Sequence, residues 1–270
     1  MTLAASFAVT AAALAFVMAL AWLLVIRGAR SGWIDAIWSF ALGAAGVAFA
    51  LKPIEGWPAD PQRRLLVAAL AGLWSVRLGW HILARTLAGG EDPRYAALKE
   101  EWADNWHRRL FLFLQVQAGA ALLLACMIFL AAHNPEAGLR WTDGLGALLV
   151  AVAIVGEGLA DAQLSRFRRN PANKGKLCDT GLRALSRHPN YFFQWLGWTG
   201  YAVIAIGPDG GYPWGWAALA GPVFMYWLLV HASGIPPLEA HMLRSRGQAF
   251  RNYQRRVNAF WPGPQRAAAP

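Results

Sequence analysis

Residues 3–26, LAASFAVTAAALAFVMALAWLLVI, form the first of several long apolar stretches and contain no charged side chain. A helix needs about 20 apolar residues to cross the hydrocarbon core of a bilayer, and this stretch is long enough. It has no basic segment before it and is longer than the apolar core of a secretory signal peptide. We therefore expect a retained transmembrane helix here.

Six further apolar stretches follow and predict seven spans in all, of which the sixth is short. They cover residues 33–51, 65–84, 110–132, 141–160, 191–207 and 213–233. Of the 270 residues 57% are hydrophobic and 15% are charged, whereas soluble domains carry about 25% charged residues. So apolar a chain is not disordered, and its two cysteines are too few for a disulfide scaffold or a four-thiolate zinc site.

These features predict an all-α, polytopic integral membrane helix bundle, followed by an amphipathic cytoplasmic helix. We expect a single membrane domain over residues 1–270, with N-terminal spans in 3–132, a C-terminal half in 141–262 and a disordered tail in 263–270.

The positive charges predict the orientation. Seven spans create two alternating sets of loops, and 20 of the 25 Lys and Arg residues fall in the set that includes the C-terminal tail. Four fall in the other set (Lys52, Arg63, Arg64 and Arg140), and Arg77 lies within a span. Since Lys and Arg favour cytoplasmic loops, we expect the N-terminus outside and the C-terminus in the cytoplasm.

The same distribution explains the net charge of +10. Topology and anionic lipid account for basic loops without any nucleic acid, and no nucleic-acid-binding motif accompanies them. We expect membrane lipid as a partner, no nucleic acid, and find no sign of a protein partner.

Four ionisable residues lie within or at the ends of predicted spans: Asp35, Arg77, Glu157 and Asp161. A charge among apolar residues is costly unless it is paired or hydrated, so each is a candidate functional residue. Asp35 and Arg77 are a candidate ion pair, which is either architectural or part of a site. Glu157 and Asp161 are four residues apart, but too few ligands surround them in sequence to predict a metal site.

The loop before the sixth span carries the densest polar signal. Residues 165–201 read SRFRRNPANKGKLCDTGLRALSRHPNYFFQWLGWTGY. Arginine presents a fixed fork of donors that suits phosphate, and Asn190 and Tyr191 add hydrogen-bonding groups at the membrane surface. Such a loop suits a phosphate-bearing cofactor or lipid headgroups, and topology alone also explains it.

The segment after the last span begins with Pro236, Pro237 and Glu239 and continues as a basic amphipathic helix. Leu243, Phe250 and Tyr253 lie on or near its apolar side. Such a helix either lies on the bilayer surface or packs back onto the loop that contains Arg187 and His188.

Together, these motifs resemble a superfamily of membrane enzymes that contains steroid 5α-reductases, sterol reductases, and isoprenylcysteine or phospholipid methyltransferases. The chain is most similar to an uncharacterised bacterial family allied to the steroid 5α-reductases. The resemblance runs from about residue 31 to 262. It rests on Asp35 in WIDAIWS, Arg77 in LWSVRL, 91–95 (EDPRY), 173–176 (NKGK), 179–182 (DTGL), 187–191 (RHPNY), 233–236 (SGIP), Glu239 and 247–253 (GQAFRNY).

The resemblance implies NADPH-dependent reduction of a carbon–carbon double bond conjugated to a ketone, in a lipophilic substrate of steroid or isoprenoid type. It implies a cofactor site formed by Arg168, Lys174, Asp179, Arg187, His188, Asn190, Tyr191, Gln194, Glu239 and Tyr253. Gln194 stands where the reductases have a Glu. The Glu and Tyr that hold the substrate carbonyl in those enzymes have no clear counterparts, and Asp35, Arg77 or Tyr95 are the candidates to replace them. No metal is implied.

Two alternatives remain open. The same superfamily contains S-adenosylmethionine-dependent methyltransferases of lipid or prenyl substrates, which share the 187–191 and Glu239 features. A non-enzymatic, lipid-binding membrane protein is the third reading.

Overall fold

The computed structural model describes residues 1–89 and 91–266. Within them the chain is built from helices, with no named strand. Six segments are long and apolar enough to cross a membrane: Leu3–Ile26, Gly32–Leu51, Pro61–Ala88, Pro93–Ala132, Trp141–Arg169 and Pro213–Arg256. The predicted fold class, an all-helical polytopic membrane protein, is confirmed.

The described residues contain nine α-helices, which include the predicted spans and two further helices, α4 and α9. They are α1 (Leu3–Ile26), α2 (Gly32–Leu51), α3 (Pro61–Ala88), α4 (Pro93–Trp102), α5 (Trp106–Ala132), α6 (Trp141–Arg169), α7 (Pro189–Ile206), α8 (Ala220–Trp227) and α9 (Ile235–Arg256). The short sixth stretch is α7. The seventh consists of a 3₁₀ segment (Pro213–Leu219), α8 and a π-helical segment (Leu228–Ala232).

Local sequence signals set two of the helix starts. Asp60 caps α3 by accepting hydrogen bonds from the backbone N–H groups of Gln62 and Arg63, and Pro61 follows at the first helical position. Asp92 and Pro93 repeat this arrangement at the start of α4. Both are the usual Asp-Pro signal for a helix N-terminus.

The chain divides into two compact units. Unit 1 comprises residues 1–148 and 200–221, and unit 2 comprises residues 149–199 and 222–270. These boundaries differ from the expected halves, since residues 141–148 and 200–221 belong to unit 1. The single membrane domain stays a prediction.

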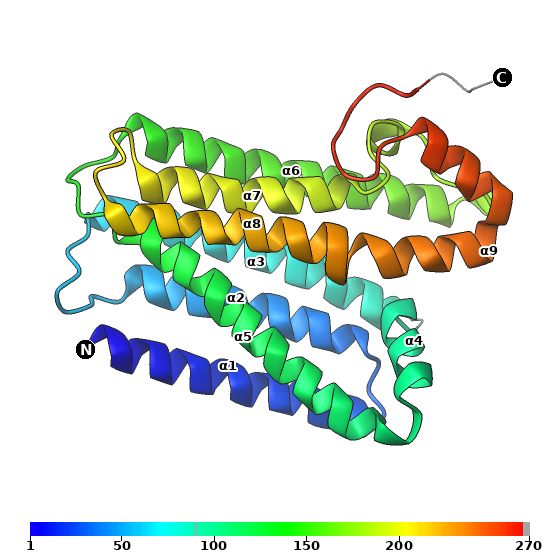
Figure 1. The fold of residues 1–270 in the computed structure, drawn as a ribbon, viewed down its shortest axis with the longest axis horizontal. Helices are drawn as coiled ribbons and strands as arrows, with labels where there is room; N and C mark the ends of the chain where they lie inside the picture. The colour runs from blue at the N-terminus through cyan, green and yellow to red at the C-terminus, as the bar shows by residue number, and fades with distance from the viewer. Residues whose placement is uncertain (90, 267–270) are drawn as a thin grey trace. The chain divides into compact units, whose positions relative to one another are not determined.

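In unit 1, α2 packs closely on α3, and α1 and α5 lie beside them (Figure 1). Glycine allows the close approach: a Cβ on Gly43 would lie 2.0 Å from the Cβ of Ser75, and one on Gly79 would lie 2.6 Å from the ring of Phe40. Small residues serve this purpose in membrane helices because backbones can then come close together.

The helices of unit 1 also expose large apolar side chains. Phe16, Leu73 and Val116 are 64%, 62% and 70% exposed. A water-soluble surface rarely carries so many, whereas a bilayer covers them. The protein is therefore an integral membrane protein in contact with lipid.

In unit 2, α9 packs back onto the loop between α6 and α7, residues 170–188. Phe250, Tyr253 and Val257 form a buried cluster with Leu177, Met242 and Leu243. The helix bends at Gly247, whose φ of 50° is outside the range that other residues favour. Of the two readings of the amphipathic helix, the structure supports packing onto the loop.

Candidate functional site

The first candidate group of polar side chains lies in unit 1 and centres on Asp35. We call Asp35, Asp92, Arg94, Tyr95 and Gln117 the Asp35 cluster. The Tyr95 hydroxyl donates to Asp35 Oδ1 over 2.9 Å, and Arg94 pairs with Asp35 Oδ2. Gln117 Nε2 donates to the Tyr95 oxygen over 3.3 Å. Tyr95 is only 3% exposed, so α2 and α4 hold a carboxylate and a phenol together in a mostly buried setting, with Gln117 of α5 beside them.

Arg94 is held in place by Asp92 as well as by Asp35. Its Nε lies 3.0 Å from Asp92 Oδ1 and its Nη2 lies 2.9 Å from Asp92 Oδ2. Burial would raise the pKa of Asp92, but the hydrogen bonds and charge of Arg94 outweigh burial and hold that pKa below its usual value. The motif at 91–95 therefore starts α4, fixes Arg94 and delivers Tyr95 to Asp35.

The expected partner of Asp35 requires a correction. The sequence suggested Arg77, whereas the structure pairs Asp35 with Arg94, a residue absent from the predicted site. Arg77 lies in α3 and is half-buried. The signal for Arg94 was its place beside Tyr95 in the 91–95 motif, but a pair 59 residues apart in the chain cannot be read from hydropathy.

The second candidate group lies in unit 2 and centres on Glu239. Arg187 approaches it with two nitrogens: Nε lies 2.7 Å from Oε1 and Nη2 lies 3.1 Å from Oε2. His188 Nε2 lies 2.9 Å from Oε1, and Gln254 Nε2 donates to Oε2 over 2.7 Å. We call Arg187, His188, Glu239 and Gln254 the Glu239 network; it joins the loop to α9.

The Glu239 network leaves its members little capacity for a ligand. Glu239 accepts four contacts, and Arg187 also donates from Nη1 to the carbonyl oxygens of Gln254 and Val257. A carboxylate only accepts, so Nε2 of His188 carries the shared proton. Burial lowers the pKa of His188 below its usual value, with Glu239 opposing the shift, which favours the neutral ring.

Two more predicted cofactor residues also make internal contacts. The Tyr253 hydroxyl donates to the Arg183 carbonyl over 2.6 Å, and Asp179 Oδ2 lies 3.0 Å from Arg256. The structure therefore brings Asp179, Arg187, His188, Glu239 and Tyr253 together as supports of the loop and α9. The remaining predicted residues in unit 2 are Arg168 and Lys174, which are exposed, Asn190 and Tyr191, which are half-buried, and Gln194, which is buried.

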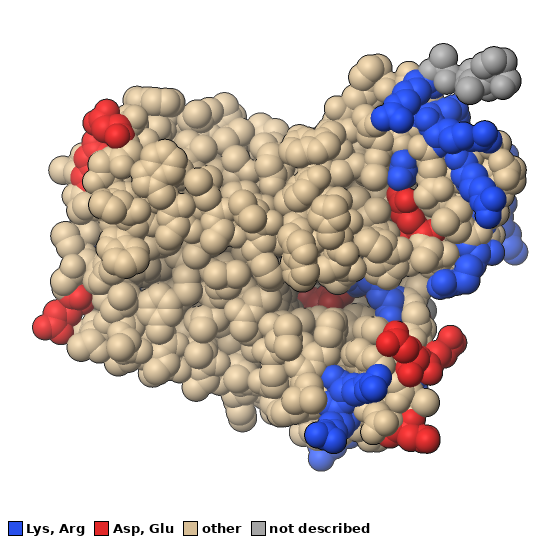
Figure 2. Space-filling view, viewed as in Figure 1, with Lys and Arg blue, Asp and Glu red and all other residues tan. Residues whose placement is uncertain are grey.

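The surface of unit 2 is strongly basic around these residues. Lys and Arg side chains gather over α9 and the segment after it (Figure 2). The exposed cations at the end of α6, in the loop and in α9 are Arg166, Arg168, Arg169, Lys174, Lys176, Arg244, Arg246, Arg251 and Arg255. Arginine-rich surfaces of this kind attract phosphate groups.

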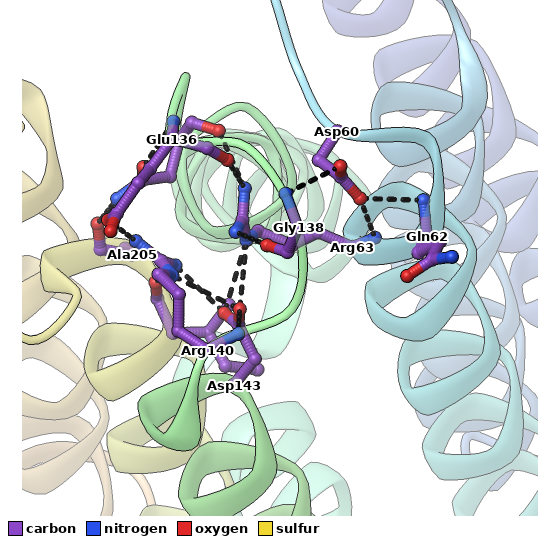
Figure 3. Close-up of polar contacts among 10 residues, drawn as sticks. Asp60, Gln62, Arg63, Glu136, Gly138, Arg140, Asp143 and Ala205 are labelled. Atoms are coloured by element: carbon purple, nitrogen blue, oxygen red, sulfur yellow. Dashed lines mark hydrogen bonds and ion pairs between the residues drawn. The ribbon is translucent and has the colours of Figure 1, made fainter.

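A third polar group, in unit 1, was missed in the sequence. Arg63 is fully buried, and its Nε lies 3.1 Å from Asp143 Oδ1. Its Nη1 donates to the carbonyls of Asn134 and Glu136 over 2.9 and 2.7 Å. Arg140 shares the same carboxylate, with Nη2 2.8 Å from Asp143 Oδ1 (Figure 3).

This third group is an architectural fastening. Each nitrogen of Arg63 has a protein partner and the side chain is fully buried, so these contacts serve the fold. The sequence treated Arg63 and Arg140 as loop charges that set topology; the structure buries them and uses them to tie residues 134–143 to the start of α3.

The tail expected to be disordered, 263–270, begins in a bonded segment. Gly263 N–H donates to the Leu185 carbonyl over 3.0 Å, and Arg266 N–H donates to the Arg256 carbonyl over 2.9 Å. Residues 267–270 lie outside the described residues.

Comparison with known proteins gives a family and one curated relative. An uncharacterised protein of Schizosaccharomyces pombe is 25% identical over 270 residues, which cover 89% of this chain and 75% of the relative. No solved structure matches the chain. The model of a family described as "Protein of unknown function (DUF1295)" matches residues 21–257. The chain therefore belongs to the DUF1295 family.

Proposed function

We propose that this protein is a membrane-embedded, NAD(P)H-dependent reductase of a lipophilic enone, with a steroid- or isoprenoid-like substrate. The observation that carries the proposal is the Glu239 network. It holds the Arg187–Tyr191 motif, which resembles the cofactor motif of steroid 5α-reductases and their relatives, in a fixed conformation beside a cation-rich loop. The relation to that superfamily is part of the proposal.

The residues of unit 2 fit a phosphate-bearing cofactor by their chemistry. Arg168 and Lys174 are exposed cations, Asn190 offers an amide, and Tyr191 offers a hydroxyl. These four, with Gln194, are the proposed contacts to NADPH, while Asp179, Arg187, His188, Glu239 and Tyr253 hold the loop in position. When bound, the nicotinamide cofactor supplies the hydride.

The Asp35 cluster supplies the acid group of the proposal. Tyr95 is a hydrogen-bond donor fixed by Asp35 and Gln117, and Arg94 balances the charge of Asp35. We propose that the Tyr95 hydroxyl donates a hydrogen bond to the carbonyl oxygen of the substrate and stabilises the negative charge that develops there. A positioned donor of this type is worth about 10²–10³ in rate. Arg77, also expected at the site, keeps no assigned role.

The topology proposal places the N-terminus outside and the C-terminus in the cytoplasm of a bacterial inner membrane. It is supported by the positive charge of the loop and α9, since such segments remain cytoplasmic. A fluorescent-protein fusion at the C-terminus should fluoresce, and an alkaline phosphatase fusion there should be inactive. The opposite pair of results would reverse the topology.

The cofactor is tested by calorimetric titration of the full-length protein in lipid nanodiscs with NADPH and, separately, S-adenosylmethionine. We expect saturable binding of NADPH. In Asn190→Ala the dissociation constant should rise by a factor of about ten or more, because a hydrogen bond to a charged ligand contributes about 1.5–3 kcal/mol. Asn252→Ala, which removes an exposed asparagine of α9, is the matched control and should bind as the parent does.

The same titration separates the alternatives. Binding of S-adenosylmethionine alone would replace the reductase with a lipid or prenyl methyltransferase. Binding of neither compound would favour a non-enzymatic lipid-binding protein.

A further inference from the structure

We propose that unit 2 binds one acyl chain of a bilayer phospholipid in a groove at the start of α7. The groove has a volume of about 470 Å³ and is lined by Leu182, Leu185, Pro189, Phe192, Phe193, Trp195, Trp261 and Pro262. All eight side chains are hydrocarbon or aromatic, and the volume falls within the usual range of ligand sites. Such a lining suits a hydrocarbon chain and not a nucleotide.

The walls of the groove are fixed by hydrogen bonds between the loop and the C-terminal segment. The N–H groups of Arg187 and His188 donate to the carbonyls of Asn258 and Ala259 over 2.8 and 3.1 Å. In the opposite direction, Gly263 N–H donates a hydrogen bond to the Leu185 carbonyl over 3.0 Å. This double attachment holds the segment carrying Trp261 along the loop.

Aromatic packing completes the walls. The rings of Trp195 and Trp261 meet edge to face with their centroids 5.0 Å apart, and the ring of Phe192 lies 6.0 Å from Trp261. Edge-to-face contacts of this kind are favourable and directional. The groove is therefore a built feature of unit 2.

The groove is continuous with a surface that faces the bilayer. Phe193, one of its walls, packs on Gly156 of α6, where an added Cβ would lie 2.4 Å from the ring. The neighbouring Val155 and Leu159 are 61% and 53% exposed, and α6 is one of the helices able to span the membrane.

Two lining residues extend this apolar surface beyond the helices. Leu185 is 43% exposed and Trp261 is 48% exposed, although both lie outside the segments able to span a membrane. Large apolar side chains at the end of a span are characteristic of the membrane interface. The hydrocarbon that reaches the groove therefore comes from the bilayer.

Charge complementarity favours a phospholipid over a neutral lipid. The end of α6 and the loop that leads into the groove carry the exposed cations Arg169 and Lys176, which attract anionic headgroups at the membrane surface. A phospholipid satisfies both features, with its chain in the groove and its phosphate among these cations.

Native mass spectrometry of the full-length protein, released from phosphatidylglycerol nanodiscs, tests the proposal. We expect one phospholipid retained per chain, and at least a fivefold smaller lipid-bound fraction in Leu185→Glu. Leu159→Glu changes a similarly exposed leucine outside the groove and should retain lipid as the parent does. No retained phospholipid, a retained isoprenoid or sterol-like molecule in its place, or equal loss in both variants would overturn the proposal.

A second measurement needs no variant and so does not depend on correct folding of Leu185→Glu. Phosphatidylglycerol with a diazirine in its acyl chain is reconstituted with the parent protein, irradiated and mapped by peptide mass spectrometry. We expect labelling of residues 182–195 and 261–262 to exceed that of the exposed face at 152–159. Equal labelling of both regions would contradict a specific chain site.

Discussion

Arg187 and Glu239 lie 52 residues apart in the chain but form a two-point ion pair, with Nε–Oε1 and Nη2–Oε2 separations of 2.7 and 3.1 Å. The side chains are only 10% and 12% exposed. The pair fastens α9 to the loop that carries the candidate cofactor motif, so the rigidity of this loop depends on it.

Removal of one partner should therefore destabilise unit 2. Arg187→Ala leaves Glu239 buried with one cation fewer, and breaking a buried pair in this way costs about 3–5 kcal/mol. We expect a clear fall in the thermal unfolding temperature in detergent. Arg251→Ala, which removes an exposed arginine of α9, should change it little; equal effects would show that the pair is not special.

The buried His188 predicts a pH dependence. Its pKa is lowered in the folded protein. Below about pH 6.5, which is the usual pKa of histidine, His188 therefore takes up a proton more readily in the unfolded chain than in the folded one. Stability contributed by His188 is therefore present above pH 6.5 and is lost as the pH falls below it, by at most about 1.4 kcal/mol per pH unit.

Thermal unfolding between pH 7.5 and 5.5 measures this effect as the difference between the parent and His188→Gln. The difference is needed because burial also lowers the pKa of His133, which acts in the same direction. An identical pH dependence in both proteins would refute the role of His188.

The fastening at Arg63 should tolerate no simple replacement. Arg63→Lys keeps the charge but loses the fork of donors that reaches Asp143, Asn134 and Glu136. We expect a loss of about 3 kcal/mol or more in the free energy of unfolding. Arg64→Ala, at the adjacent and partly exposed arginine, is the control and should cost less; the reverse order would contradict the assignment.

The close contact of α2 and α3 predicts a difference between two glycines. Gly43→Ala would drive a methyl group into Ser75 and should destabilise unit 1 by about 1–3 kcal/mol through overpacking. Gly119, in α5, has nothing within 4 Å of an added Cβ, so Gly119→Ala should be neutral or slightly stabilising. Equal unfolding curves for the two variants would argue against the packing.

The spans could be predicted from the sequence because membrane crossing leaves a local signal. All seven apolar stretches fall in helical segments, and the ends of α1 are those predicted. Six of them lie in the described segments long and apolar enough to cross a membrane, and the sixth stretch, α7, is not one of these. Helix α4 was missed because it is only ten residues long and largely polar. Helix α6 continues to Arg169, beyond the apolar stretch that ended at 160, because backbone hydrogen bonding does not stop where hydropathy falls.

The site could be predicted only as a set of residues. Sequence motifs identified Asp35, Tyr95, Arg187 and Glu239, but the partner of Asp35 is set by how α4 folds back toward α2, which no local pattern encodes. The structure shows that several residues expected to contact a cofactor also make contacts that hold the loop, and their contact with a cofactor stays a prediction. The apolar groove combines residues from 182–195 and 261–262, and no local pattern connects segments so far apart in the chain.

The central claim is the reduction of a lipophilic enone with hydride from NADPH, and the most direct test is cofactor consumption by the full-length protein in nanodiscs. NADPH is followed spectroscopically over a panel of sterol-like and isoprenoid α,β-unsaturated ketones, with product analysis by mass spectrometry. We predict one double bond reduced per NADPH oxidised, and a kcat about 10²–10³-fold lower in Tyr95→Phe with NADPH affinity unchanged. No oxidation of NADPH with any ketone, or methyl transfer from S-adenosylmethionine to a lipid, would contradict the account.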